Sequence, residues 1–127
     1  MNSGVEIFRT NQLGTNVDVR LNPTAGNAYL VLRGNDTVIG NLSGSNSATA
    51  AVIENVEGDT GIAASRLTVT QTTNATFRGY VRNGNWNGGS GGLAITKNGA
   101  ATLTIDGIDS GDYVTYTGGT VVNEGRL

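Results

Sequence analysis

The chain has 127 residues and a formal net charge of −2, and this weakly acidic balance argues against a nucleic-acid-binding protein, which normally presents a basic face. It contains no His and no Cys, which excludes Ser-His-Asp and Cys-His catalysis, thiol redox chemistry, disulfides and nearly all zinc sites. No apolar run approaches the roughly 18 residues of a membrane-spanning helix. We therefore expect no enzyme, no nucleic-acid partner and no membrane insertion by this chain.

Short runs of alternating apolar and polar residues succeed one another along the chain, whereas no window shows the apolar spacing of an amphipathic helix. Alternation with a period of two is typical of a strand with one buried face. In chain order the runs lie at 17–21, 30–33, 67–70, 77–82, 93–96 and 102–105. The side chains predicted to point inward are Leu30, Leu32, Leu67, Val69, Leu93, Ile95, Leu103 and Ile105.

Many short strands with little between them are compatible with a sandwich, a barrel or a solenoid. Enrichment in Thr, Asn and Gly favours the solenoid, because stacked coils place like residues above like and Gly permits sharp corners. The turn dipeptides Asn83-Gly84 and Asn98-Gly99 fit such corners. We therefore expect one all-β domain over residues 1–127.

Two segments near the C-terminus carry a more specific pattern. Residues 91–105 read GGLAITKNGAATLTI and residues 115–127 read TYTGGTVVNEGRL. They resemble the stretches "GGL-x-K-x-G-x-GTLTL" and "NTYTGGTTVNAGTL" of the autotransporter-associated β-strand repeat, also called the passenger-associated transport repeat. Weaker matches occur in the family's order at 76–79, 37–44 and 12–15. The chain departs from the family at 108–114, which forms a longer and more acidic insertion.

This resemblance implies a right-handed parallel β-helix, for which we expect four to six coils. It also implies an extracellular or bacterial cell-surface location, since the repeat occurs in secreted passenger segments of bacterial surface proteins. There it serves as a stalk or as a folding and secretion aid, without catalysis of its own.

An acidic loop is the one candidate metal site. Asp106, Asp109 and Asp112 recur at every third residue, and converging carboxylates can hold Ca²⁺ through their oxygen atoms. Asp also favours turns, so a solvated acidic turn without metal is the alternative. The sequence implies no other cofactor.

Two further side chains invite a functional interpretation. Lys97 is the only lysine and matches the family's lysine, and its strand–turn setting predicts a surface turn rather than a nucleophile. Trp86 lies in a loop rich in Asn and Gly, where it either contacts a ligand such as a sugar or covers the edge of the core.

The order of the segments predicts how copies of the chain associate. In the family pattern, a strand like the one at 120–127 comes directly before a segment of the kind found here at 5–15. The chain is therefore expected to be one period of a longer or end-to-end stacked solenoid, with an assembly interface formed by Val5, Ile7, Phe8, Val121, Val122 and Leu127. No polar capping coil is evident at either end, although solenoids normally need one to stay soluble.

The sequence supports two functional hypotheses. The first is a non-catalytic structural subunit that forms an extracellular filament or stalk, with itself as its head-to-tail partner. The second is an excised passenger segment of a bacterial autotransporter adhesin that binds a host or glycan surface.

Overall fold

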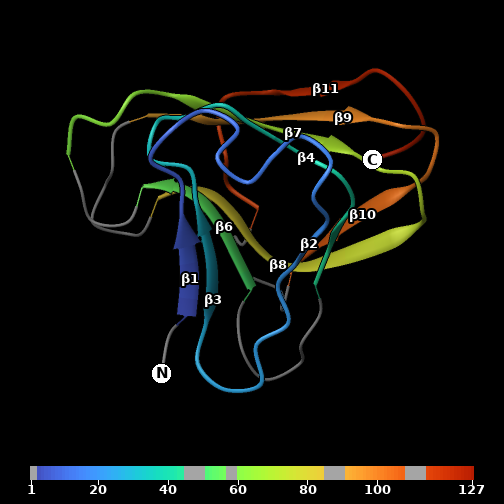
Figure 1. Cartoon of the computed structure of the whole chain (residues 1–127), viewed down its shortest axis with the longest axis horizontal. Coiled ribbons are helices and arrows are strands. Elements are labelled where there is room, and N and C mark those ends of the chain that lie inside the picture. Colours follow the sequence, from blue (N-terminus) through green and yellow to red (C-terminus); the bar gives the residue numbers. More distant parts are fainter. Residues whose placement is uncertain (1–2, 45–50, 57–59, 85–90, 108–113) are drawn as a thin grey trace.

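The computed structural model describes residues 3–44, 51–56, 60–84, 91–107 and 114–127. Within these ranges the chain forms eleven β-strands and no helix. Every strand pair is parallel, and the strands build a β-solenoid of about four turns. The predicted all-β solenoid is therefore confirmed (Figure 1).

The strands are arranged in three parallel sheets. The first sheet has the order β1 (Ser3–Glu6), β3 (Ala28–Val31), β6 (Ala51–Val56), β8 (Ala75–Gly84) and β10 (Leu103–Asp106). The second has the order β11 (Thr120–Val122), β9 (Leu93–Asn98), β7 (Ser65–Thr70) and β4 (Thr37–Ile39). The third contains β2 (Val19–Arg20) and β5 (Leu42–Ser43), and a bridge from Gly44 to Phe77 links it to β8.

Strand β8 belongs to two faces of the solenoid, because it continues around a corner. Its residues 75–78 pair with β10, and its residues 79–84 pair with β6. At the corner, a Cβ on Gly79 would clash with the carbonyl oxygen of Ala51, so only glycine permits this close approach of the two chains.

Parallel register places side chains of one kind above one another in columns that run along the solenoid axis. One inward column contains Val5, Leu30, Ile53 and Val81, which are direct register partners in consecutive coils. The predicted inward side chains are buried with at most 2% exposure, except Ile105, which is partly buried against the core. The alternation in the sequence therefore identifies the core correctly.

Asparagine side chains complete the backbone hydrogen bonds at the corners, where the ladder between coils is interrupted. Asn55 is fully buried: its amide nitrogen donates to the carbonyls of Ala63 (2.7 Å) and Gly91 (3.1 Å), and its oxygen accepts from the N–H of Gly34 (2.7 Å). Asn83 likewise accepts from the N–H groups of Leu93 and Thr117 at 2.9 and 3.0 Å. Buried peptide groups that would otherwise lack partners are thereby satisfied.

The core columns make a quantitative prediction. Leu103→Ala should lower the free energy of unfolding by about 2–5 kcal/mol, because Leu103 is fully buried and its truncation leaves a cavity. The matched control Thr104→Ala, on the exposed face of the same strand, should change stability by less than about 0.5 kcal/mol. Urea denaturation followed by circular dichroism measures both values, and equal losses would contradict the assigned inward face.

Candidate functional site

Exposed apolar side chains gather at the two ends of the solenoid. Seven large hydrophobic side chains are exposed among the described residues, and none of them lies between residues 18 and 113. The N-terminal end surface contains Val5, Phe8 and Val17. The C-terminal end surface contains Val114, Val121, Val122 and Leu127.

The predicted interface residues divide into two groups. Five of them are exposed and belong to the end surfaces, with exposed fractions from 38% for Leu127 to 67% for Phe8. Ile7 differs, because it is completely buried and packs in the core. Its backbone N–H continues the ladder to Val31 at 2.8 Å. Ile7 is therefore a core residue of this chain and adds no exposed apolar surface to the predicted interface.

The strand β1 forms the outer edge of its sheet at the N-terminal end. It pairs with β3 on one side, and no strand of the described residues pairs with its other side (Figure 1). All four of its residues are exposed. Backbone groups along such an edge offer a ladder to a further parallel strand.

A turn at residues 9–15 covers part of this end, so the expectation of two uncapped ends holds only in part. Asn11 adopts a left-handed conformation (φ 53°), and its side-chain oxygen accepts from the N–H of Val38 at 2.9 Å. The Asn11 N–H in turn donates to the Asp36 carbonyl at 3.2 Å. Leu13 is partly buried and packs against the core. The turn therefore caps the second sheet and leaves the first and third sheets uncovered.

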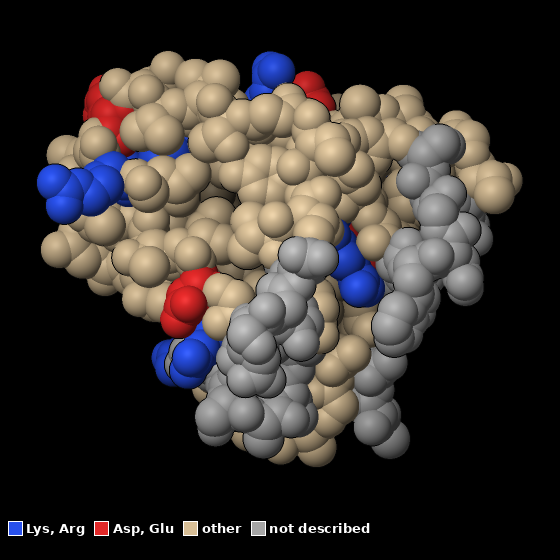
Figure 2. Space-filling model, turned by 180° about the vertical axis from the view of Figure 1, so that it is seen from behind, with Lys and Arg blue, Asp and Glu red and all other residues tan. Residues whose placement is uncertain are grey.

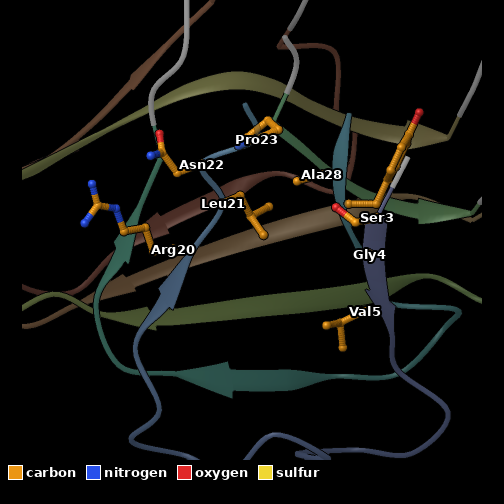
Figure 3. Close-up of a pocket in the computed structure, with 9 residues that line it drawn as sticks. Ser3, Gly4, Val5, Arg20, Leu21, Asn22, Pro23 and Ala28 are labelled. Carbon is orange, nitrogen blue, oxygen red and sulfur yellow. The ribbon is translucent and has the colours of Figure 1, made fainter. Parts of the chain in front are cut away.

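A hollow of about 370 Å³ opens beside β1 at this uncovered corner. Figure 3 shows Val5 and Leu21 on its two sides, where the first and third sheets meet. Arg20, Asn22 and Tyr29 add polar groups to its lining. The hollow thus has an apolar interior and a polar margin.

At the C-terminal end, the last coil adds one rung to each face of the solenoid. The N–H of Thr115 donates to Val81, that of Asn123 to Lys97, and that of Leu103 to Arg126, at 2.9–3.0 Å. Register places Val122 on the inward column of Val69 and Lys97, whereas Val121 continues the outward column of Thr68 and Thr96. Val122 thus ends an inward column, and Val121 lies on the outer face.

Lys97 does not lie at a surface turn, which corrects the interpretation from the sequence. Its side chain is completely buried and points inward from β9. The ammonium group donates to the carbonyls of Asn98, Gly99 and Glu124 at 2.9, 2.6 and 3.1 Å. Lys97 thereby ties the turn at Glu124 to the preceding coil and holds the last rung in place.

Burial lowers the pKa of Lys97 from its ordinary value of 10.5, and the nearby Glu124 carboxylate partly opposes this shift. The three carbonyl oxygens accept hydrogen bonds from the charged group, which compensates for its loss of water. The ammonium group therefore acts as a clamp between coils.

Of the three acidic candidates, Asp106 is the one that lies within the described residues. Asp109 and Asp112 lie outside the described residues, and Asp106 forms an ion pair with Arg78 (Nε–Oδ2, 3.4 Å) in which both side chains are about half exposed. Within the described ranges no three carboxylates gather closely enough to hold a metal ion. The other candidate, Trp86, also lies outside the described residues.

A buried ion pair is a feature that the sequence pattern did not predict. Glu54 is completely buried on the outer face of β6 and accepts from Arg82 Nε at 2.7 Å. These residues are direct register partners in adjacent coils, 28 positions apart, and the arginine also lies over the Tyr80 ring at 5.2 Å. The signal that identifies such a pair is the register between coils, which local alternation does not contain.

Comparison of the chain with protein-family models, with curated proteins and with solved structures found no match. The geometry itself defines the class: a parallel β-solenoid in which the exposed large apolar side chains of the described residues lie at its ends. The described ranges contain no helix with the length and apolar character needed to cross a lipid bilayer. Figure 2 shows few charged side chains on one face of the molecule, separated by wide uncharged areas.

The clamp predicts a specific pH dependence. Because burial lowers the pKa of folded Lys97, the unfolded chain binds more protons between that lowered pKa and 10.5, and stability contributed by this group rises with pH across that window. Lys97→Met should abolish this contribution. The unfolding free energies of the parent and of Lys97→Met are measured at pH 7 and at pH values approaching 10.5. The difference between the two chains is then compared across pH, because the contribution of the tyrosines is common to both and cancels. A difference that is constant or falls with rising pH would contradict the buried, charged lysine.

Proposed function

We propose that this chain is a non-catalytic structural subunit that assembles head-to-tail with copies of itself into a β-solenoid filament or stalk. The observation that carries the proposal is that, among the described residues, the exposed large apolar side chains lie on the two end surfaces. Exposed apolar patches of this kind are typical of surfaces that become buried in an assembly.

The two end surfaces differ from each other, which determines the type of assembly. Val5 begins an inward column of the first sheet, and Val114 bridges to Val81 in the same column at the opposite end. A contact between two different surfaces on opposite ends is heterologous and leads to an open fibre. Hence each added copy presents a fresh C-terminal end surface.

Sheet membership determines which strands meet at such a junction. β1 lies in the first sheet, whereas β11 lies in the second sheet beside β9. A junction that keeps each sheet continuous therefore places the Val114 segment of one copy on β1 of the next copy. β11 then meets the turn at 9–15 instead of pairing with β1.

Association at this junction combines two favourable contributions. The free edge of β1 gains backbone hydrogen bonds, and the apolar ends of the columns leave water, at about 25 cal/mol per Å² of apolar area. The weak net charge of −2 opposes the contact little. Both contributions must exceed the loss of translational and rotational freedom on association.

We place this subunit outside the cell or on a bacterial cell surface, on the resemblance to the autotransporter-associated β-strand repeat. The proposal assigns it neither a metal, a cofactor nor a nucleic-acid partner. The alternative, a passenger segment that binds a host or glycan surface, depends on Trp86 and stays a hypothesis from the sequence.

The test is the assembly state of purified chain and of variants at each end. The parent should form concentration-dependent polymers in sedimentation velocity and fibres in electron micrographs. Val5→Asp and Leu127→Asp should each abolish them, because either change buries an unpaired charge at the junction while leaving the core columns of the interior intact.

The matched control is Thr76→Asp, which adds the same charge on the exposed outer face of β8 in an interior coil and should polymerise like the parent. Circular dichroism and thermal melting are used to check that each variant is folded. A parent that stays monomeric at high concentration, or end variants that polymerise as well as the control, would refute the proposed assembly.

A further inference from the structure

One outward column runs from the third sheet past the first residues of β8 and β10, and it begins and ends in opposite charges. Register sets Asp18 beside Asn41 at one end, and Asn74 beside Thr102 and then Arg126 at the other end. Asn41 N donates to Asp18 Oδ1 at 2.7 Å, and Thr102 N donates to Asn74 Oδ1 at 2.8 Å. Between the two halves, the Asn41 side-chain oxygen accepts from the N–H groups of Thr72 and Thr73 in the next coil, directly before Asn74. Asp18 therefore marks the N-terminal end of this column, and Arg126 marks its C-terminal end.

Both terminal charges are accessible. Asp18 and Arg126 are exposed, and the hydrogen bonds that Asp18 accepts from Asn41 both end on its Oδ1 atom. Neither residue forms an ion pair within the described part of the chain. The interior members Asn41, Asn74 and Thr102 carry no charge, so the charges of this column are found only where a neighbouring molecule would contact it.

The molecule already uses matched charges to join adjacent coils. Arg82 and Glu54 are register partners and form an ion pair at 2.7 Å, and Arg78 and Asp106 are register partners that form one at 3.4 Å. In both cases opposite charges at one column position in consecutive coils meet across the ladder. The same geometry applied to the column of Asp18 and Arg126 requires a second copy.

We propose that Arg126 of one copy pairs with Asp18 of the next copy and so fixes the register of the head-to-tail junction. This inference rests on the proposed function and names the recognition that the junction uses. In the same register, Leu127 continues the inward column of Val19, and Val114 continues that of Val5. The apolar hollow between β1 and the segment at 20–23 lies beside these two columns and is closed by the arriving copy.

The pairing makes a prediction that distinguishes register from simple apolar stacking. Arg126→Glu places two negative charges at the junction, and Asp18→Arg places two positive charges there. Each variant alone should need a roughly tenfold higher concentration for half-assembly than the parent, because like charges at matched positions disfavour association. An equimolar mixture should assemble like the parent, since every junction between the two variants again joins opposite charges.

Two controls make the outcome specific. Arg66→Glu changes the net charge as Arg126→Glu does, but at an exposed site in an interior coil, and should assemble like the parent. Since Asp18→Arg also removes the hydrogen bonds to Asn41, Asp18→Asn serves as a second variant that retains the acceptor oxygen. In a double-mutant cycle, Asp18→Asn should relieve the defect of Arg126→Glu.

Sedimentation velocity on the parent, the variants and the mixture separates the possible results. Recovery in the mixture and coupling in the cycle support the pairing. If the parent polymerises and Arg126→Glu assembles no differently from Arg66→Glu, the pairing of Arg126 with Asp18 is refuted, whereas the proposed head-to-tail assembly is not. A monomeric parent would overturn both.

Discussion

The parallel backbone ladder between consecutive coils is the constraint on which the rest of the structure depends. Each strand pairs with the equivalent strand of the next coil, so equivalent side chains stack in columns with little freedom to differ. The inward columns become aliphatic, because every member must fit beside its neighbours in one narrow core. The corners become rich in asparagine and glycine, since the ladder is interrupted there and peptide groups need other partners.

The same constraint explains why the ends of the molecule matter. A ladder does not terminate by itself, and each end leaves backbone groups and apolar side chains that the interior coils would bury. The turn at 9–15 covers the second sheet through Asn11 and Leu13, and Lys97 secures the last rung through the turn at Glu124. These contacts hold the first turn and the last rung in place. Val5 and Leu127 nevertheless stay exposed.

Local patterns in the sequence predict much of this fold and little of the site. Alternation over two residues identifies buried positions such as Leu67 and Leu103, because burial on one face of a strand is a local property. The setting of Lys97 escapes prediction, since its carbonyl partner at Glu124 belongs to the next coil, 27 residues away. The same applies to the buried pair of Glu54 and Arg82 and to Ile7, whose burial depends on how the first coil meets the second. Once the register between coils is known, the position of each of these residues in its column explains its contacts.

The central claim is that β1 gains a partner strand from another copy, and amide hydrogen exchange measures this most directly. Exchange is monitored by mass spectrometry at a series of protein concentrations, with peptides from β1, the segment at 114–117 and the central strands β6 and β7 compared. Head-to-tail assembly predicts that protection of β1 and of the segment at 114–117 rises with concentration, while protection of β6 and β7 stays constant. Protection of these two segments that is independent of concentration would contradict it.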